Sequence, residues 1–424
     1  MADLEVVEIC AGAGGQALGL ERAGFEHALA VELDPVACAT LRANRPAWKI
    51  AEGDVADQQV WRPADYAGVT LLAGGVPCPP FTVAGRQLGA NDERDLYAWA
   101  VELCGIVRPR ALLLENVRGL STDRFSAYRQ HVLDRLRELG YVPGWRLLQA
   151  SDFGVPQLRP RTVLVALRPE DAAWFRWPSG AVVSSAVVSG ADELPPTVGS
   201  TLADLMAARG WQGTAAWVTR ADRIAPTIVG GSKKHGGADL GPTRAKRAWA
   251  ALGVDGMGVA DLSPGPDSEL THIPKLTCEM VARLQGWQDE WGWRFSGLKT
   301  ARYRQIGNAF PPPVAEAVGT AIRLALSHSG TPVSAGVTEP ADDPVFLALR
   351  ASDGYLSAGE LTRLTGMRYN AVVRHLENLG QDFELSVISV ADEPAYRLGN
   401  FKAFLGQEDH VRNQQFAAGR SRIS

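Results

Sequence analysis

One cysteine stands in a setting that suits a reactive thiol. Cys78 lies between Pro77 and Pro79 in the stretch GGVPCPPFTVAGRQ, directly after the apolar run VTLLAGG. Proline restricts φ and has no N–H to donate, so the loop that carries the thiol is stiff. A cysteine just past a buried strand lies at the sheet edge where ligands bind. The pattern favours a positioned nucleophile here, and inert packing for the other cysteines.

Two further strand ends carry charged side chains. Glu115 and Asn116 close the apolar run ALLLENV, and Gln157, Arg159 and Arg161 lead into the run RTVLVAL. A carboxyl group at such a position is a candidate proton donor, and guanidinium groups at alternate positions lie on one side of the chain. A cysteine, a glutamate and an arginine at three strand ends predict one convergent site.

A glycine-rich loop follows the first apolar run of the chain. The stretch EICAGAGG has glycines at positions 12, 14 and 15 and precedes a helical pattern, while Glu32 and Asp54 end the next two strand candidates. Such a loop alone is weak evidence, because many nucleotide folds share it. A carboxylate at Glu32 can accept hydrogen bonds from two ribose hydroxyls. The combination predicts an adenosine-containing cofactor along the carboxyl ends of the strands.

The elements that must position these residues alternate between strand and helix. Strand candidates lie at 4–9, 28–33, 69–75, 111–117 and 161–167, and helix candidates at 16–25, 34–44 and 95–108. This alternation is typical of βαβ units, so we expect an α/β fold with a mostly parallel, Rossmann-like sheet.

Changes in composition and periodicity along the chain indicate several domains. We expect a core at 1–169 with the cofactor site, a smaller irregular domain at 170–273 where periodicity fades, a return to the core at 274–328, a linker at 329–344, a third domain at 345–401 and a loose tail at 402–424. In the third domain, Ser357 and Glu360 form a capping-box pattern, and a helix at 368–380 precedes strand candidates at 383–390 and 395–401. Helices followed by a two-stranded wing are typical of a winged helix.

Composition sets the broad class. The chain has 424 residues and five scattered cysteines, with no C-x-x-C pair to indicate a zinc site or a disulfide framework. We therefore expect no metal, and the reducing cytoplasm as the compartment. Neither a membrane span nor a signal peptide is indicated. The net charge is −4, but seven basic and two acidic residues occupy positions 220–249. This local surplus is either a solvated patch or a nucleic-acid footprint.

These motifs together resemble a known family. From about Val6 to Leu326 the chain resembles the S-adenosylmethionine-dependent DNA cytosine-5 methyltransferases of prokaryotic restriction-modification systems. The resemblance rests on EICAGAGG, GGVPCPPFT, ENV, the Q-x-R-x-R pattern of 157–161, LTCEMVARLQGWQDEW and RYRQIGNAFPPPVAEAVG, in the family's order. It departs from the family at Cys10, where phenylalanine is usual, at Pro79 (glutamine), at Thr82 (serine) and at Lys275 (arginine).

The resemblance implies a reaction and roles for its residues. The thiolate of Cys78 would attack C6 of a cytosine flipped out of double-stranded DNA, beneath a hinged loop at 79–96. Glu115 would bind N3 and the exocyclic amine, Arg161 would hold O2, and Arg159 would support the site. The cofactor contacts would be Cys10, Ala11, Gly12, Gly14, Gly15, Glu32, Leu33, Asp54, Val55, Pro77, Asn308 and Ala309. S-Adenosylhomocysteine would be the product.

The same resemblance places target recognition in the irregular domain. Phosphate and base contacts are expected from Arg86, Arg94, Gln157, Arg220, Arg223, Thr227, Ser232, Lys233, Lys234 and His235. A methyltransferase acting on transfer RNA and a regulatory DNA-binding protein with vestigial activity stay open as alternatives. Residues 341–399 carry nine acids against five arginines, so we expect the third domain to contact protein rather than DNA. We expect a monomer.

Overall fold

The computed structural model describes residues 4–76, 96–180, 196–231, 237–332, 343–390 and 393–402. Several predicted site residues lie outside these ranges: Pro77, Cys78, Arg86, Arg94, Ser232, Lys233, Lys234 and His235. Within them, no helix is long and apolar enough to cross a membrane.

A seven-stranded sheet forms the centre of the molecule. Its strands are β1 (Glu5–Ile9), β2 (Glu26–Glu32), β3 (Ile50–Glu52), β4 (Leu71–Gly75), β5 (Ala111–Val117), β6 (Val142–Gln149) and β7 (Pro160–Leu167), in the order β3-β2-β1-β4-β5-β7-β6. The first five positions in that order pair in parallel, and β7 runs antiparallel to both of its neighbours. The mostly parallel α/β fold predicted from the sequence is confirmed.

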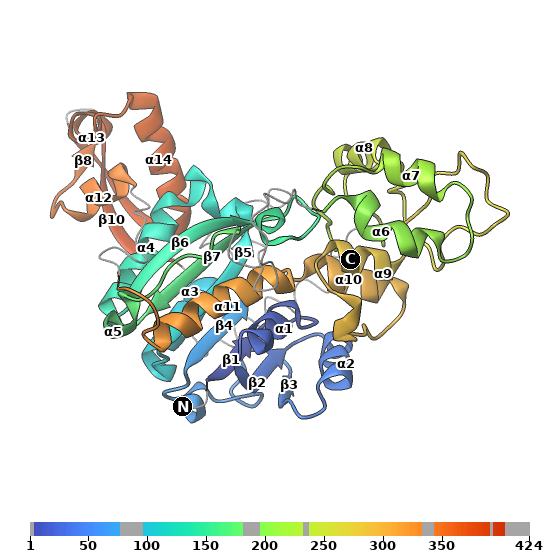
Figure 1. Ribbon diagram of the computed structural model, residues 1–424. Coiled ribbons are helices and arrows are strands. Elements are labelled where there is room, and N and C mark those ends of the chain that lie inside the picture. The colour runs from blue at the N-terminus through green and yellow to red at the C-terminus, as the bar shows by residue number, and fades with distance from the viewer. Residues whose placement is uncertain are drawn as a thin grey trace.

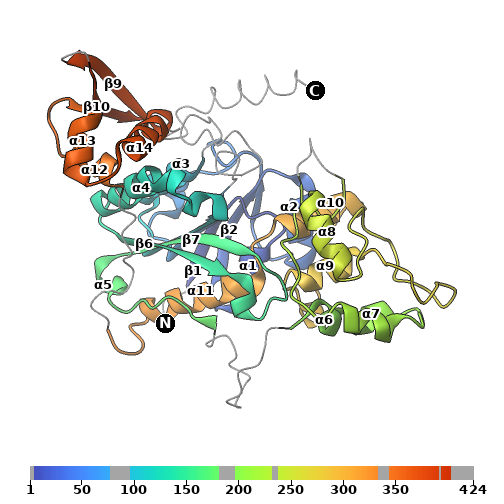
Figure 2. The same ribbon diagram turned by 90° about the horizontal axis from the view of Figure 1, so that it is seen from above.

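Helices cover both faces of this sheet (Figures 1 and 2). On one face, α3 (Leu96–Val107) and α4 (Ser126–Glu138) pack against the side chains that include Val7 and Leu72. On the other face, α1 (Gly15–Arg22) and α11 (Pro312–Leu326) pack against Val6 and Leu71. Successive strand residues point to opposite faces, which is why neighbours such as Val6 and Val7 belong to different cores. The helix α2 (Pro35–Asn44) and the short α5 (Pro169–Ala172) complete this part.

A second helical unit lies beside the sheet at one end of the molecule (Figure 1). It contains α6 (Val198–Ala207), α7 (Thr214–Arg220), α8 (Thr243–Ala251), α9 (Cys278–Leu284) and α10 (Lys299–Asn308). One core joins Trp217, Trp249, Met280 and Tyr303. Part of the stretch predicted to be irregular is therefore helical, and its helices share their core with residues that follow position 274.

The third domain lies at the opposite end of the molecule, against α4 (Figures 1 and 2). Its elements are α12 (Pro344–Arg350), β8 (Leu356–Ser357), α13 (Ala358–Thr365), α14 (Tyr369–Asp382), β9 (Phe383–Val390) and β10 (Glu393–Phe401). The predicted capping box is present, with Ser357 N donating to Glu360 Oε2 at 2.7 Å and Glu360 N donating to Ser357 Oγ at 3.2 Å. The predicted helices and wing are present, although β8 adds a third strand to the wing and α14 continues two residues beyond Gly380.

The close contact of α1 with α11 allows a direct test of the packing. A Cβ added at Gly19 would lie 2.5 Å from Ala315 Cβ and 2.5 Å from Pro312 O. Exchanging glycine for alanine inside a helix normally stabilises by about 0.5–1 kcal/mol. We expect Gly19→Ala instead to lower the free energy of unfolding by about 1–3 kcal/mol, because α11 must move away.

The matched control for this experiment is Gly105→Ala, inside α3. There the added Cβ would meet only Leu139 Cδ2, at 3.4 Å, and the helix should gain stability. Urea unfolding of both variants measures the difference. Equal stability of the two variants would contradict the close α1–α11 contact.

Candidate active site

The glycine loop between β1 and α1 depends on left-handed backbone angles. Cys10, Gly12 and Gly14 have φ values of 53°, 56° and 89°, and Gly14 is the N-cap of α1. A Cβ at Gly14 would lie 2.5 Å from the Trp293 ring, whose Nε1 donates to Ala13 O at 3.1 Å. Both the backbone angle and this contact favour glycine at position 14. The tryptophan, from a distant part of the chain, fixes the loop from outside.

Glu32 holds the same loop from the end of β2. Its Oε2 accepts the Gly12 N–H at 2.7 Å, and its Oε1 accepts the Asp34 N–H at 2.7 Å. Burial raises the pKa of Glu32, although these two N–H groups act in the opposite direction. Each carboxyl oxygen has a second lone pair, so the group can still accept hydrogen bonds from a ligand.

A cavity of about 250 Å³ opens between this loop and the end of α10. The predicted residues that line it are Cys10, Ala11, Gly12, Gly15, Glu32, Asn308 and Ala309, together with Glu115. Gly14, Leu33, Asp54 and Val55 are not among its lining residues, and the Leu33 side chain is 66% exposed. One continuous space therefore joins the predicted cofactor residues to the predicted substrate acid.

Sequence reasoning missed several residues of this wall, among them Glu8, Gln16, Arg304, Gln305 and Phe310. Arg304 and Gln305 precede Asn308 by four and three positions on α10, which puts all three on one side of the helix. That spacing is a signal the sequence does contain. Glu8 could not be predicted in this way, because it is a single acid within an apolar strand and no nearby residue indicates a site there.

Glu115 and Arg161 form a buried ion pair at the edge of the cavity. Because β7 runs antiparallel to β5, Val117 pairs with Arg161, and the end of one strand adjoins the start of the other. Arg161 Nε lies 2.6 Å from Glu115 Oε1, and the two side chains are 10% and 9% exposed. Burial raises the pKa of Glu115, while the positive charges of Arg161 and Arg159 act in the opposite direction. A glutamate in this setting can carry a proton and share it with a ligand.

Arg159 ties three segments together beneath this pair. It is 1% exposed and donates to Ile228 O at 2.7 Å, Gly307 O at 2.7 Å and Ala309 O at 3.0 Å. These carbonyls belong to the loop after α7 and to the end of α10. Such burial suits the supporting role expected for Arg159.

The prediction that Gln157 contacts DNA is wrong for the structure as described. The side chain is fully buried, its Nε2 donates to Gln285 Oε1 at 2.6 Å, and its Oε1 accepts the Ile228 N–H at 2.9 Å. A buried amide satisfied at both ends has no group left to face a duplex. Gln157 instead links the start of β7 to α9 and to the residues after α7.

Of the other described residues predicted to bind DNA, two donate hydrogen bonds to backbone carbonyls within the chain and the third is exposed. Arg220 Nη2 donates to Ala250 O at 2.8 Å, and Thr227 Oγ1 donates to Leu158 O. Arg223 is exposed, as are Arg244 and Arg247 on α8. These exposed arginines give the unit basic groups at its surface.

Comparison with known proteins identifies the family of this chain. The family model described as C-5 cytosine-specific DNA methylase matches residues 4–324. The chain belongs to that family. This methylase uses S-adenosylmethionine and transfers a methyl group to C5 of cytosine in DNA, as the resemblance implied.

Two relatives are similar to this methylase in sequence, and one solved structure is similar to it in fold. It is 59% identical over all of both chains to the Type II methyltransferase M.NaeI of Lentzea aerocolonigenes. It is 48% identical to the Type II methyltransferase M.NgoMIV of Neisseria gonorrhoeae, across 76% of this chain and 97% of that protein. An Entamoeba histolytica methyltransferase, EhMeth, shares the fold at 13% identity with a TM-score of 0.50, over 77% of this chain and 99% of that one.

The two hydrogen bonds of Glu32 predict a specific loss of cofactor binding. We expect Glu32→Gln to weaken S-adenosylmethionine binding about 10–100-fold, because one carboxylate acceptor is lost and the glycine loop loses its anchor. Titration calorimetry without DNA measures the affinity. Glu26→Gln, an exposed acid at the other end of β2, is the control and should bind normally. Equal affinities for both variants would contradict the assignment.

Proposed function

We propose that this methylase acts on one specific double-stranded DNA sequence as the modifying partner of a restriction endonuclease, through the residues assigned below. The observation that carries the assignment is the buried Glu115–Arg161 pair, which adjoins the cavity lined by the glycine loop and Glu32. The full-length similarity to a Type II methyltransferase supports the role in restriction and modification.

The residues around the cavity fit the cofactor that the family uses. Gly12 and Gly15 line the cavity without a side chain, Glu32 offers acceptors for ribose hydroxyls, and Asn308 lines the other side. S-Adenosylmethionine, when bound, supplies the methyl group on a positively charged sulfur. The loop, Glu32 and Asn308 would orient it towards the space beside Glu115.

We assign the attack on the base to Cys78. Its thiolate would form a bond to C6 of cytosine, which moves electron density to C5 and makes that atom nucleophilic. Three other cysteines suit this role poorly, because burial raises the pKa of Cys38 to about 12 and also raises the pKa of Cys104 and Cys278. After C5 is methylated, loss of the C5 proton lets the S–C6 bond break and releases the thiolate.

Glu115 and Arg161 would stabilise the charge that this attack places on the ring. A protonated Glu115 can donate to N3 and accept from the exocyclic amine, while Arg161 donates to O2. The burial that raises the pKa of Glu115 makes the protonated form more available near neutral pH. The base must leave the duplex to reach this site.

The helical unit that contains α7 and α8 is the proposed DNA-recognition part, with Arg220, Arg223 and Thr227 as phosphate or base contacts. The positions predicted at Arg86, Arg94 and 232–235 stay proposals outside the described residues. We propose that the protein acts as a monomer in the cytoplasm, since each flipped base needs one cavity. Methylation of transfer RNA is the competing activity, and no contact in the described structure favours it.

Removal of the thiol tests the chemistry. We expect Cys78→Ala to abolish cytosine methylation in the DNA of a host that expresses the protein, because the thiolate proposed to form the C6 bond is removed. Cys278→Ala, a half-buried thiol near Lys299, is the control and should methylate as the wild type does. Bisulfite sequencing measures both variants and reveals the recognised sequence. Unchanged methylation in the Cys78 variant would overturn its assignment, and an unmodified host genome with the wild type would overturn the DNA reaction.

The Glu115–Arg161 pair predicts a pH dependence. Activity that needs protonated Glu115 should fall as the pH rises through the raised pKa of that group. In Arg161→Gln the opposing positive charge is lost, so the pKa of Glu115 rises further and the descending limb moves to higher pH. We also expect kcat to fall about 10–100-fold, because one charged donor is removed. Profiles of kcat/KM against pH measure the shift. A descending limb at the same pH in the wild type and in Arg161→Gln would contradict the proposal that Glu115 acts in its protonated form.

A further inference from the structure

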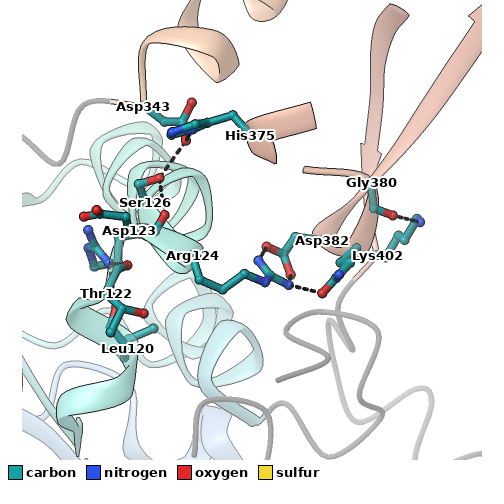
Figure 3. Close-up of polar contacts among 12 residues, drawn as sticks. Leu120, Thr122, Asp123, Arg124, Ser126, Asp343, His375, Gly380, Asp382 and Lys402 are labelled. Atoms are coloured by element: carbon teal, nitrogen blue, oxygen red, sulfur yellow. Dashed lines mark hydrogen bonds and ion pairs between the residues drawn. The ribbon is translucent and has the colours of Figure 1, made fainter. Parts of the chain in front are cut away.

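The third domain is joined to the segment that follows Glu115 by a buried ion pair (Figure 3). Two short helices, η3 (Arg118–Ser121) and η4 (Asp123–Phe125), connect β5 to α4. From η4, Arg124 Nη1 donates to Asp382 Oδ2 at 2.7 Å and Nη2 donates to Gln381 Oε1 at 2.7 Å. The Asp382 side chain is 1% exposed, and the Arg124 side chain is 13% exposed. A charge pair this well buried is sensitive to the loss of either partner.

A second polar contact centres on Asp343, the N-cap of α12. Its Oδ1 accepts the Phe346 N–H at 2.9 Å, while its Oδ2 lies 2.6 Å from Ser126 Oγ and 2.9 Å from His375 Nδ1. Burial favours the neutral form of Asp343, but the hydrogen bonds from His375, Ser126 and Phe346 outweigh it and lower its pKa. One carboxylate thus joins the first residue of α4 to two helices of the third domain.

Apolar contacts continue this interface along α4. The His131 ring lies 4.0 Å from the Phe401 ring and 5.6 Å from the Phe383 ring, centroid to centroid, and Tyr128 lies 5.5 Å from Phe401. Ala127 is buried in the core of the third domain. Phe401 packs against that core and also against the core between α4 and the sheet. The domain and the catalytic part therefore share a continuous apolar contact.

The helix α14, which a winged-helix protein would place in DNA, lies partly against the catalytic part. The recognition helix of that fold enters the major groove with its exposed side. Here His375, Gln381 and Asp382 of α14 are turned against α4 and η4. Tyr369, Asn370 and Arg374 of α14 remain exposed, so the docking covers only part of this helix, and the covered part serves the contact with the catalytic part.

The segment held by the domain leads directly back to the site. Arg129 on α4 donates to Leu120 O at 2.6 Å and Thr122 O at 2.7 Å, and Leu120 is fully buried in the core of the sheet. Nine positions separate Glu115 from Arg124. We propose that the third domain is an internal brace, which fixes residues 118–126 through Arg124 and Ser126 and thereby keeps Glu115 in place for the flipped cytosine.

The comparisons agree with a separate, added module. The family model ends at residue 324, before α12 begins. The match to M.NgoMIV takes in nearly all of that protein but leaves roughly a quarter of this chain unmatched, whereas M.NaeI matches throughout. The brace would thus lie in the part of this chain that the family model leaves out, and it rests on the proposed role of Glu115.

Kinetics of full-length variants test the brace. We expect Arg124→Ala to lower kcat roughly tenfold or more, because a shift of about an ångström in a catalytic group costs up to about a hundredfold. KM for DNA and for S-adenosylmethionine should change less than twofold, since both binding surfaces remain. Arg124→Lys, which keeps the charge, should recover part of kcat. Ser126→Ala is the milder variant, with the same direction of change, and decides the test if Arg124→Ala does not fold.

The control is Arg363→Ala, an exposed arginine of α13 on the same domain, which should match the wild type. Hydrogen exchange of the protein alone gives a second readout, with faster exchange expected in 113–126 and unchanged exchange in β1. Unchanged kcat in the Arg124 and Ser126 variants would overturn the brace. A raised KM for DNA with a smaller salt dependence would overturn it in favour of a DNA-binding surface. The exchange result stands apart from the Cys78 test, so failure of the brace and failure of the proposed chemistry are distinguishable.

Discussion

The antiparallel pairing of β7 with β5 is the constraint on which the site depends. A parallel neighbour would place its first residue at the far end of β5, away from Glu115. The observed register sets Val117 against Arg161, so an acid from the end of one strand meets a guanidinium from the start of the next. The 2.6 Å pair is buried, and neither charge would be stable there alone. The direction of β7 relative to β5 thus determines which side chains meet at this edge of the sheet.

The same strand also joins the sheet to the helical unit. Gln157 and Arg159 are buried on the approach to β7, where they satisfy backbone groups of Ile228, Gly307 and Ala309. A buried guanidinium must satisfy its donors, and carbonyls at the ends of irregular segments need donors in turn. One short stretch therefore positions Arg161 and also holds the wall of the cavity that α10 provides. The sheet and the helical unit meet at this stretch.

Much of this arrangement could be predicted from the sequence, because local patterns report local structure. Apolar runs ending at Glu32 and Glu115 marked strand ends, and the glycines at 12 and 14 marked a loop that the structure shows to be left-handed. Burial of Gln157 could not be predicted, since its partners Ile228 and Gln285 lie far along the chain. The helices α7 and α8 were also missed, because Trp217 and Trp249 are the only buried residues within them and leave no helical stripe. The helix α6 was missed although its buried Val198, Leu202 and Met206 recur every four residues.

The third domain shows why a charge count needs a structure. Its excess of acids suggested repulsion from DNA, and that argument treats every acid as exposed. Two of those acids, Asp343 and Asp382, are instead turned inward, where Ser126, His375 and Arg124 satisfy them. Their charge is compensated within the chain, so it contributes little to the field at the surface. Part of α14 is also turned against the catalytic part, through His375, Gln381 and Asp382, while Arg374 remains exposed. The preference for a protein contact over DNA stays a prediction, and the inward-facing acids weaken the charge argument for it.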